Sequence, residues 1–130
     1  MPAINGIGWF EIGTDNPAEA ERFYGDVFGW TFGNDEGAAT GADGSPYRSI
    51  TPPGEGRPAG GLFPTGGKVP NYAVFYVLVA DVDETAAAAE AAGGRVLVPA
   101  QRTPDGLTFA HMLDPSGNQF GIFAPPAGGE

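Results

Sequence analysis

Among the side chains of this sequence that could carry out acid–base chemistry, Glu11 and His111 are the two that stand out. The chain has one histidine and no cysteine, which excludes disulfides, thiolate nucleophiles and thiolate metal sites. Glu11 lies between Trp9 and Gly13 in an apolar run. An inward-facing carboxylate there must be solvated in a wet cavity, paired, or used in ligand binding or proton transfer. His111 lies in a predicted strand and is either structural or surface-exposed, or serves as a hydrogen-bond donor or base.

The charge and hydropathy of the chain exclude several classes of partner. The formal net charge is −10, from 16 acidic and six basic residues, and it would repel a phosphate backbone, so we expect no nucleic-acid binding. No apolar run approaches the roughly 20 residues of a membrane helix, so we expect no membrane contact. The first residues lack the basic start and apolar core of a signal peptide, which predicts a cytoplasmic protein.

Two similar series of predicted elements position the candidate side chains. Residues 9–15 align with residues 75–81 at a constant offset, and each segment predicts a strand, an acidic turn and a helix start. In the first half, Asp15-Asn16-Pro17 supplies an N-cap and a first-turn proline, and Gly29 ends the helix. Both halves predict the order βαβββ. The predicted strands are 7–12, one that opens with Trp30 and Phe32, 47–50, 60–63, 72–79, 95–98, 107–113 and 118–123, and the predicted loops are 34–45 and 51–59. Asp81 or Asp83 caps the second helix, whose apolar stripe runs from Thr85 to Ala92.

Six short motifs follow one another along nearly the whole chain. They are Asp15-Asn16-Pro17, Phe23-Tyr24, Phe28-Gly29-Trp30, Ala80-Asp81-Val82-Asp83, Gly93-Gly94-Arg95-Val96 and Asp114-Pro115-Ser116-Gly117-Asn118. Their order, spacing and duplication closely resemble the glyoxalase-like proteins of the vicinal oxygen chelate superfamily. This resemblance implies a single α+β domain of two βαβββ modules, approximately residues 1–66 and 67–130. Their strands would form an open, U-shaped mixed sheet around a ligand cavity, with the helices on the convex side.

The resemblance also indicates where a metal would bind. In metal-dependent members of the superfamily, histidine or glutamate side chains project into the cavity from the first and last strands of each module. These positions align with Trp9, Gly61, Phe75 and Gly121. None of the four can coordinate a divalent ion, which needs several nitrogen or oxygen donors at about 2 Å. We therefore expect no metal and no cofactor. The alternative is a shifted strand register that would recruit Glu11 and His111 as metal ligands.

The cavity should be apolar and aromatic. Strand alternation predicts that Glu11 shares a face with Trp9, and that Val77 and Val79 share one with Phe75. The residues expected to face the helices are Phe10, Ile12, Tyr76 and Leu78. The glycines at the aligned ligand positions would leave room above the sheet; alternatively, the strand aromatics only fill a core. The expected ligand-binding residues are Trp9, Glu11, Trp30, Tyr47, Arg48, Phe63, Phe75, Val77, His111 and Phe123.

Two functions are compatible with such a cavity. The first is metal-free binding of a small organic molecule, which would sequester an aromatic or cationic natural product or drug, as antibiotic-resistance proteins of the superfamily do. The alternative is a glyoxalase-related lyase or isomerase, with Glu11 as the base and His111 or Tyr47 as a hydrogen-bond donor. Arg48 would reach the cavity mouth, be solvated, or pair with a neighbouring acid. No nucleotide-binding motif follows a predicted strand, so a nucleotide enzyme is not expected.

The expected assembly is a homodimer. The resemblance implies it, and a two-fold partner could cover the open sheet edges and the aromatic concavity. Segments 52–64 and 124–129 are expected either to supply contacts or to be solvated loops.

Overall fold

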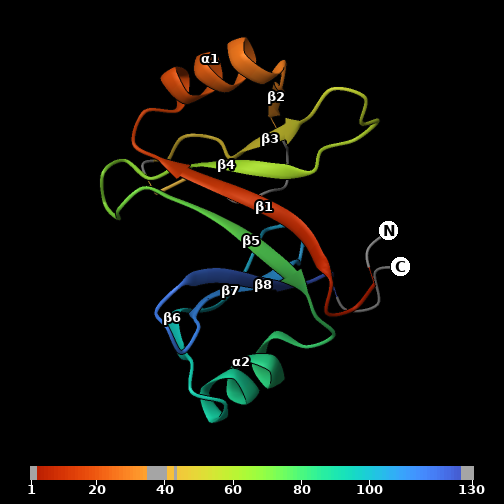
Figure 1. The fold of residues 1–130 in the computed structure, drawn as a ribbon, viewed down its shortest axis with the longest axis vertical. Coiled ribbons are helices and arrows are strands. Elements are labelled where there is room, and N and C mark those ends of the chain that lie inside the picture. Colours follow the sequence, from red (N-terminus) through yellow and green to blue (C-terminus); the bar gives the residue numbers. More distant parts are fainter. Residues whose placement is uncertain (1–2, 35–40, 43, 127–130) are drawn as a thin grey trace. The chain divides into compact units, whose positions relative to one another are not determined.

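The computed structural model describes residues 3–34, 41–42 and 44–126. In them a strand, a helix and three further strands follow one another twice (Figure 1). The elements are β1 (Ile7–Thr14), α1 (Pro17–Phe28), β2 (Thr31–Asn34), β3 (Arg48–Thr51), β4 (Gly60–Pro64), β5 (Tyr72–Leu78), α2 (Val82–Ala91), β6 (Arg95–Arg102), β7 (Thr108–Leu113) and β8 (Gln119–Ala124). The α+β class and the two βαβββ series predicted from the sequence are therefore confirmed.

The chain divides into two compact units with the same strand arrangement. The first unit is residues 9–73, and the second is residues 74–126 with the residues before Trp9. In the first unit the strand order is β2-β3-β4-β1, with β4 parallel to β1 and antiparallel to β3. In the second unit the order is β5-β8-β7-β6, with β8 parallel to β5 and antiparallel to β7. The internal repeat in the sequence is thus a repeat of topology.

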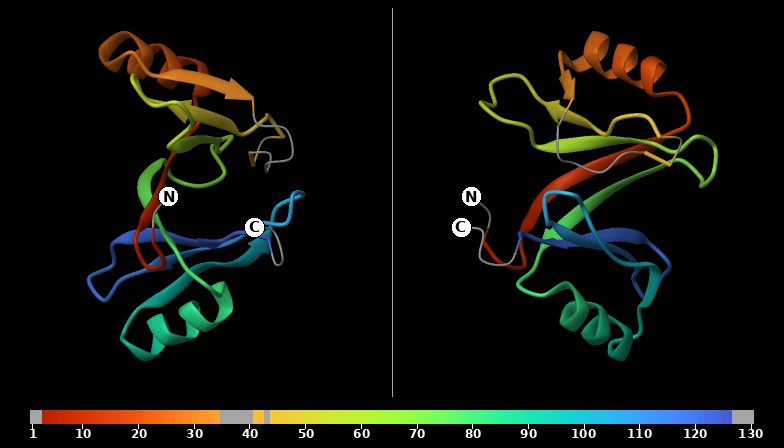
Figure 2. Two further views of the ribbon diagram at one scale, coloured as in Figure 1. Left: turned by 90° about the vertical axis from the view of Figure 1, so that its right-hand side faces the viewer. Right: turned by 180° about the vertical axis from the view of Figure 1, so that it is seen from behind.

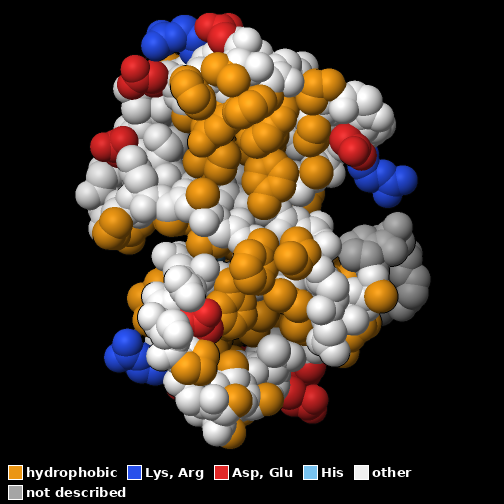
Figure 3. All heavy atoms as spheres, in the orientation of Figure 1, with side chains coloured by type: hydrophobic (Ala, Val, Ile, Leu, Met, Phe, Trp, Pro, Cys, Tyr) orange, Lys and Arg blue, Asp and Glu red, His pale blue; other side chains and the backbone are white. Residues whose placement is uncertain are grey.

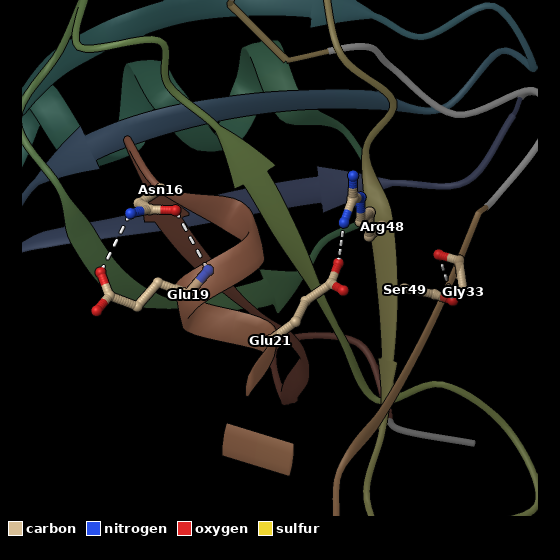
Figure 4. Close-up of polar contacts among 6 residues, drawn as sticks. All are labelled: Asn16, Glu19, Glu21, Gly33, Arg48 and Ser49. Carbon is tan, nitrogen blue, oxygen red and sulfur yellow. Dashed lines mark hydrogen bonds and ion pairs between the residues drawn. The ribbon is translucent and has the colours of Figure 1, made fainter. Parts of the chain in front are cut away.

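Helix α1 starts and ends as the sequence predicts and covers one face of the first unit's strands (Figures 1 and 2). The side-chain oxygen of Asn16 accepts a hydrogen bond from the backbone N–H of Glu19 at 3.2 Å (Figure 4), which satisfies one open donor of the first turn. Gly29 ends the helix with φ +75°, a conformation that glycine adopts without steric cost. The ring of Tyr24 stacks on Trp30 at a centroid distance of 5.0 Å and so ties the helix to the chain entering β2.

Much apolar surface on α1 nevertheless remains exposed. Phe23, Val27 and Phe28 are each more than half exposed. Figure 3 shows hydrophobic side chains gathered on the face of the first unit that is turned toward the viewer. On the strand side, Phe10 packs near Trp30 at a centroid distance of 5.6 Å. The helix side of this unit is therefore an aromatic layer that is only partly buried.

Helix α2 packs on the second unit's strands through a smaller and better buried core. Asp81 caps the helix by accepting the backbone N–H of Glu84 at 2.9 Å. The buried core consists of Val79, Val82, Ala110, Met112, Ile122 and Ala124. The predicted turn between β7 and β8 is confirmed, because the Asp114 carboxylate accepts the backbone N–H groups of Ser116 and Asn118, both at 2.9 Å.

The sequence predicts one further loop and two segments that either supply dimer contacts or are solvated loops. Parts of the predicted loop 34–45 and of the expected dimer contact 124–129 lie outside the described residues. In the other expected contact, 52–64, the last five residues form strand β4 rather than a solvated loop. Among the described residues, no helix is long and apolar enough to cross a membrane.

The cap of α1 can be tested in isolation. Replacing Asn16 by alanine should lower the free energy of unfolding by about 1 kcal/mol, because the Glu19 N–H loses its acceptor. Asn16→Asp, which keeps an acceptor at the helix N-terminus, should retain most of the stability. Urea unfolding followed by circular dichroism measures both variants, and equal losses for alanine and aspartate would contradict the capping role.

Candidate ligand-binding site

A buried carboxylate organises one face of the first unit. Glu11 is only 7% exposed, and its two oxygens accept hydrogen bonds from two phenols. The Tyr47 hydroxyl donates to Oε1 at 2.9 Å, and the Tyr72 hydroxyl donates to Oε2 at 2.5 Å. The indole N–H of Trp9 donates to the Tyr47 oxygen at 3.0 Å. These four side chains, called the Glu11 cluster below, form one hydrogen-bonded network.

Strand geometry explains how the sequence builds this cluster. Trp9 and Glu11 lie two residues apart on β1, so they share the face opposite α1, as predicted. Gly61 on β4 is the register partner of Glu11. A Cβ atom at Gly61 would lie 1.7 Å from the Tyr47 oxygen, and one at Gly13 would lie 2.3 Å from the Tyr72 ring. Each tyrosine therefore lies directly over a strand glycine, and neither could do so over any other residue.

The protonation states follow from burial and from the charge of Glu11. Burial raises the pKa of Tyr47 well above its usual range, and the neighbouring Glu11 carboxylate raises it further. The same two causes, in the same order, raise the pKa of Tyr72. Both phenols are therefore neutral donors at ordinary pH. Their hydrogen bonds replace part of the hydration that the Glu11 carboxylate loses on burial.

The second unit contains a polar cluster of a different character. His111 on β7 is 5% exposed, and Tyr76 on β5 is 4% exposed. Nε2 of His111 lies 2.5 Å from the Tyr76 hydroxyl, and Nδ1 lies 2.9 Å from the amide nitrogen of Gln119. If the Gln119 amide donates to Nδ1, then Nε2 carries the proton and donates to Tyr76. Burial lowers the pKa of His111 to about 4, so the imidazole is neutral at ordinary pH.

The expectation that strand glycines leave open space above the sheet is wrong. In the first unit the Tyr47 hydroxyl fills the place of a Gly61 side chain. In the second unit a Cβ atom at Gly121 would lie 2.4 Å from the Tyr76 ring. Gly121 is the register partner of Tyr76 on β5 and of His111 on β7. A tyrosine ring thus occupies the glycine position in both units.

The expected faces of β5 are also wrong, by one residue. Phe75 stacks on Phe120 at 6.1 Å and is 45% exposed, and Val77 packs against the core under α2. Tyr76, expected to face the helix, is on the opposite side with His111. Register explains the error, because shifting a strand by one residue moves every side chain to the other face. Phe75 and Val77 therefore do not lie on the face of the polar cluster.

The remaining predicted residues divide between the two faces. Trp30 stacks on Tyr24 on the helix side, so its expected place in the cavity is wrong. Arg48 also lies on that side, where it forms an ion pair with Glu21 of α1 (Figure 4); this is the pairing alternative considered for it. On the opposite face of the first unit, Phe63 is the register partner of Gly13. In the second unit, Phe123 lies edge-on to Tyr76 at a centroid distance of 6.1 Å. Tyr72, Tyr76 and Gln119 were not predicted as site residues; the four-residue spacing of the two tyrosines, which places them on one face of β5, is the sequence signal that could have identified them.

The residues present do not fit a divalent metal. Within the described parts of the chain, no group of three or more His, Cys, Asp or Glu side chains could hold a metal ion. Of the positions that align with metal ligands, Gly61 and Gly121 carry tyrosine atoms where their side chains would begin. The oxygens of Tyr47 and Tyr72 that donate hydrogen bonds to Glu11 belong to neutral phenols, which are weak ligands for hard ions.

A separate, shallow pocket of about 560 Å³ lies beside α1, away from the Glu11 cluster. None of the four side chains of the cluster lines it. Its lining residues are Thr14, Asp15, Asn16, Glu19, Ala20, Arg22, Phe23, Asp26, Val27 and Asn71. We place the candidate site at the cluster, because buried and hydrogen-bonded polar groups are a more specific sign of recognition than an open surface depression.

The Tyr72 hydrogen bond should contribute measurably to stability. Tyr72→Phe removes one donor from a buried carboxylate and should lower the free energy of unfolding by about 1.5–3 kcal/mol. Tyr24→Phe, on the helix side, is the matched control and should change it by less than about 0.5 kcal/mol. Chemical denaturation at neutral pH measures both, and equal effects would show that the Glu11 contact is not special.

His111 should make stability depend on pH. The unfolded chain binds a proton at His111 below a pKa of 6.5, whereas the folded chain does so only near 4. Its contribution is therefore complete above pH 6.5, is lost as the pH falls, and levels off below about 4, with a total loss of up to about 3 kcal/mol. Acid titration of stability in the wild type and in His111→Gln isolates this effect. Parallel curves for the two proteins would contradict it.

Comparison with known proteins identifies the family. Residues 6–122 match the family model described as Glyoxalase/Bleomycin resistance protein/Dioxygenase superfamily. Proteins named "Putative glyoxylase CFP32" from Mycobacterium bovis and Mycobacterium tuberculosis are 38% identical to the chain over 117 residues. The aligned region is 90% of this chain but 43% of each relative, so the chain spans less than half the length of these proteins.

Solved structures show the same fold at low identity. A methylmalonyl-CoA epimerase from Mycobacterium tuberculosis superposes with a TM-score of 0.62 and 16% identity, covering 96% of this chain and 93% of that one. An Mn(II)-bound glyoxalase from Novosphingobium aromaticivorans gives 0.60 and 19%, covering 95% and 40%. The match to the family model, over most of the chain, is what establishes membership: this protein belongs to the glyoxalase/bleomycin resistance protein/dioxygenase superfamily, also called the vicinal oxygen chelate superfamily.

Proposed function

We propose that this domain binds a small organic molecule at the Glu11 cluster without a metal ion, and that the ligand presents a cationic or N–H group to the carboxylate. The observation that carries the proposal is a carboxylate only 7% exposed that is held by two phenolic hydroxyls. Burying an ionised group is costly, so its presence among aromatic side chains on a sheet face requires a reason beyond packing.

The surroundings of Glu11 favour a cationic ligand. Trp9, Tyr47 and Tyr72 place three aromatic rings beside one negative charge. Aromatic faces attract cations, and a carboxylate is a complementary partner for an N–H donor or a positive charge. The net charge of −10 would also raise the local concentration of cationic molecules near the protein. In a superfamily whose description includes bleomycin resistance, these features support sequestration of an aromatic or cationic natural product or drug.

A second candidate is an enzyme that uses Glu11 as a general base. The contact that favours it is the 2.5 Å hydrogen bond from Tyr72, since a neutral phenol beside a carboxylate could donate to an oxyanion as the base removes a proton. The fold is shared with proteins named as an epimerase and a glyoxalase. Both carboxylate oxygens of Glu11 already accept a hydrogen bond, however, which leaves them less available to take a proton from a substrate. We therefore place binding first. A catalytic role for His111, a homodimer and a cytoplasmic location stay predictions.

Isothermal titration against matched pairs of aromatic amines and aromatic alcohols tests the binding function. We expect saturable binding of an amine and at least about a tenfold loss of affinity in Glu11→Gln, which keeps the shape of the side chain and removes its charge. The matched control is Glu55→Gln in an exposed loop, which should bind like the wild type. Unchanged affinity in Glu11→Gln, or no amine that binds, would reject the proposal.

The enzymatic alternative has its own readout. Exchange of a carbon-bound proton of a test ligand with deuterated solvent, followed by NMR, detects a base that acts on the ligand. Exchange that Glu11→Gln abolishes and Glu55→Gln leaves unchanged would establish the second candidate in place of simple binding.

A further inference from the structure

The strand position opposite Glu11 decides what can lie beside the carboxylate. Gly61 on β4 and Glu11 on β1 are register partners in a parallel pair, so a side chain at position 61 would project from the same face. Neighbouring strands are about 5 Å apart, which is a suitable distance for two side chains to share one small ligand or ion. The identity of residue 61 is therefore a property of the Glu11 site.

A side chain at position 61 and the observed position of Tyr47 exclude each other. A Cβ atom built on Gly61 would lie 1.7 Å from the Tyr47 oxygen and 2.1 Å from the ring carbon that bears it. Contacts this short involve the hydroxyl that donates to Glu11 and accepts from Trp9, so no small adjustment of the ring relieves them without breaking the network. The Tyr47 hydroxyl can reach Glu11 only because position 61 is glycine.

We propose that Gly61 is a specificity-determining residue of the Glu11 site. Because Gly61 has no side chain, the Tyr47 hydroxyl lies beside the carboxylate, in the space that a metal-ligating side chain at position 61 would occupy. A histidine or glutamate at this position would put a second ligating group next to Glu11 and displace Tyr47 at the same time. Residue 61 thus selects between a hydrogen-bonded carboxylate that recognises organic donors and a carboxylate that shares a divalent ion. The inference rests on the proposed function, since both place the ligand at Glu11.

The second unit contains a related arrangement that does not depend on an acid. Gly121 is the register partner of Tyr76, and the Tyr76 ring fills the place of a side chain at Gly121. There the hydroxyl meets the neutral His111 rather than a carboxylate. The pairing of glycine with tyrosine thus occurs in each unit at the position that aligns with a metal ligand, which argues against a chance contact at Gly61.

Two measurements test the proposal, and neither needs an organic ligand. The first is the spectrophotometric titration of tyrosine at 295 nm. In Gly61→Ala, Tyr47 should leave Glu11, so one more tyrosine than in the wild type should ionise with an ordinary pKa of about 10. The control is Gly56→Ala, where a Cβ atom meets nothing within 4 Å, and it should titrate like the wild type. Identical titrations for Gly61→Ala and the wild type would overturn the proposal.

The second measurement is Ni²⁺ binding by isothermal titration. The double variant Tyr47→Ala/Gly61→His empties the slot before adding the imidazole, which keeps the test usable if Gly61→His alone fails to fold. It should bind Ni²⁺ at least about tenfold more tightly than Tyr47→Ala, because carboxylate and imidazole then lie side by side. Gly56→His controls for an added surface histidine and should match the wild type. Equal affinities for the double variant and Tyr47→Ala would overturn the proposal, whereas failure of amines to bind the wild type would reject only the proposed function.

Discussion

The arrangement of side chains on the face of the first unit opposite α1 depends on the cost of burying a carboxylate. Glu11 is 7% exposed, and an ionised group at such a position is tolerated only when hydrogen bonds replace its hydration. Two phenols supply these bonds, and Trp9 orients one of them. Each phenol can approach Glu11 only where a strand carries glycine. The need to hydrogen-bond the Glu11 carboxylate therefore explains Gly61, its partner on the neighbouring strand, and Gly13, two positions further along β1.

The same cost of burial makes the titratable group of the second unit neutral. Burial disfavours the charged form of any titratable group, and it lowers the pKa of His111 to about 4, whereas the two oxygens of Glu11 each accept a hydrogen bond from a phenol. Tyr76 over Gly121 serves a neutral partner with the same hydroxyl chemistry. The two units therefore share a topology and the packing of a tyrosine over a strand glycine, while one hydrogen-bonded cluster is centred on a carboxylate and the other on a neutral imidazole.

The sequence predicts the fold because its signals are local and periodic. The cap at Asn16 and the Asp114 turn are formed by side chains bonding to nearby backbone, and such motifs can be read without tertiary information. The shared face of Trp9 and Glu11 follows from strand alternation. The faces of β5 could not be predicted in the same way, because its residues are apolar on both sides and the alignment with β1 is off by one residue. That error hid Tyr72 and Tyr76.

The glycines show most clearly what a sequence alone leaves open. A glycine at a position that the family resemblance aligns with a metal ligand is compatible with an open cavity or with a slot filled from elsewhere in the chain, and the two have opposite consequences for ligand binding. The filling residue lies 14 positions before Gly61 in the sequence, and only the fold brings them together. Under this proposal, two coupled positions, Tyr47 and Gly61, would give the fold a hydrogen-bonded carboxylate site without any change in the strands that position them.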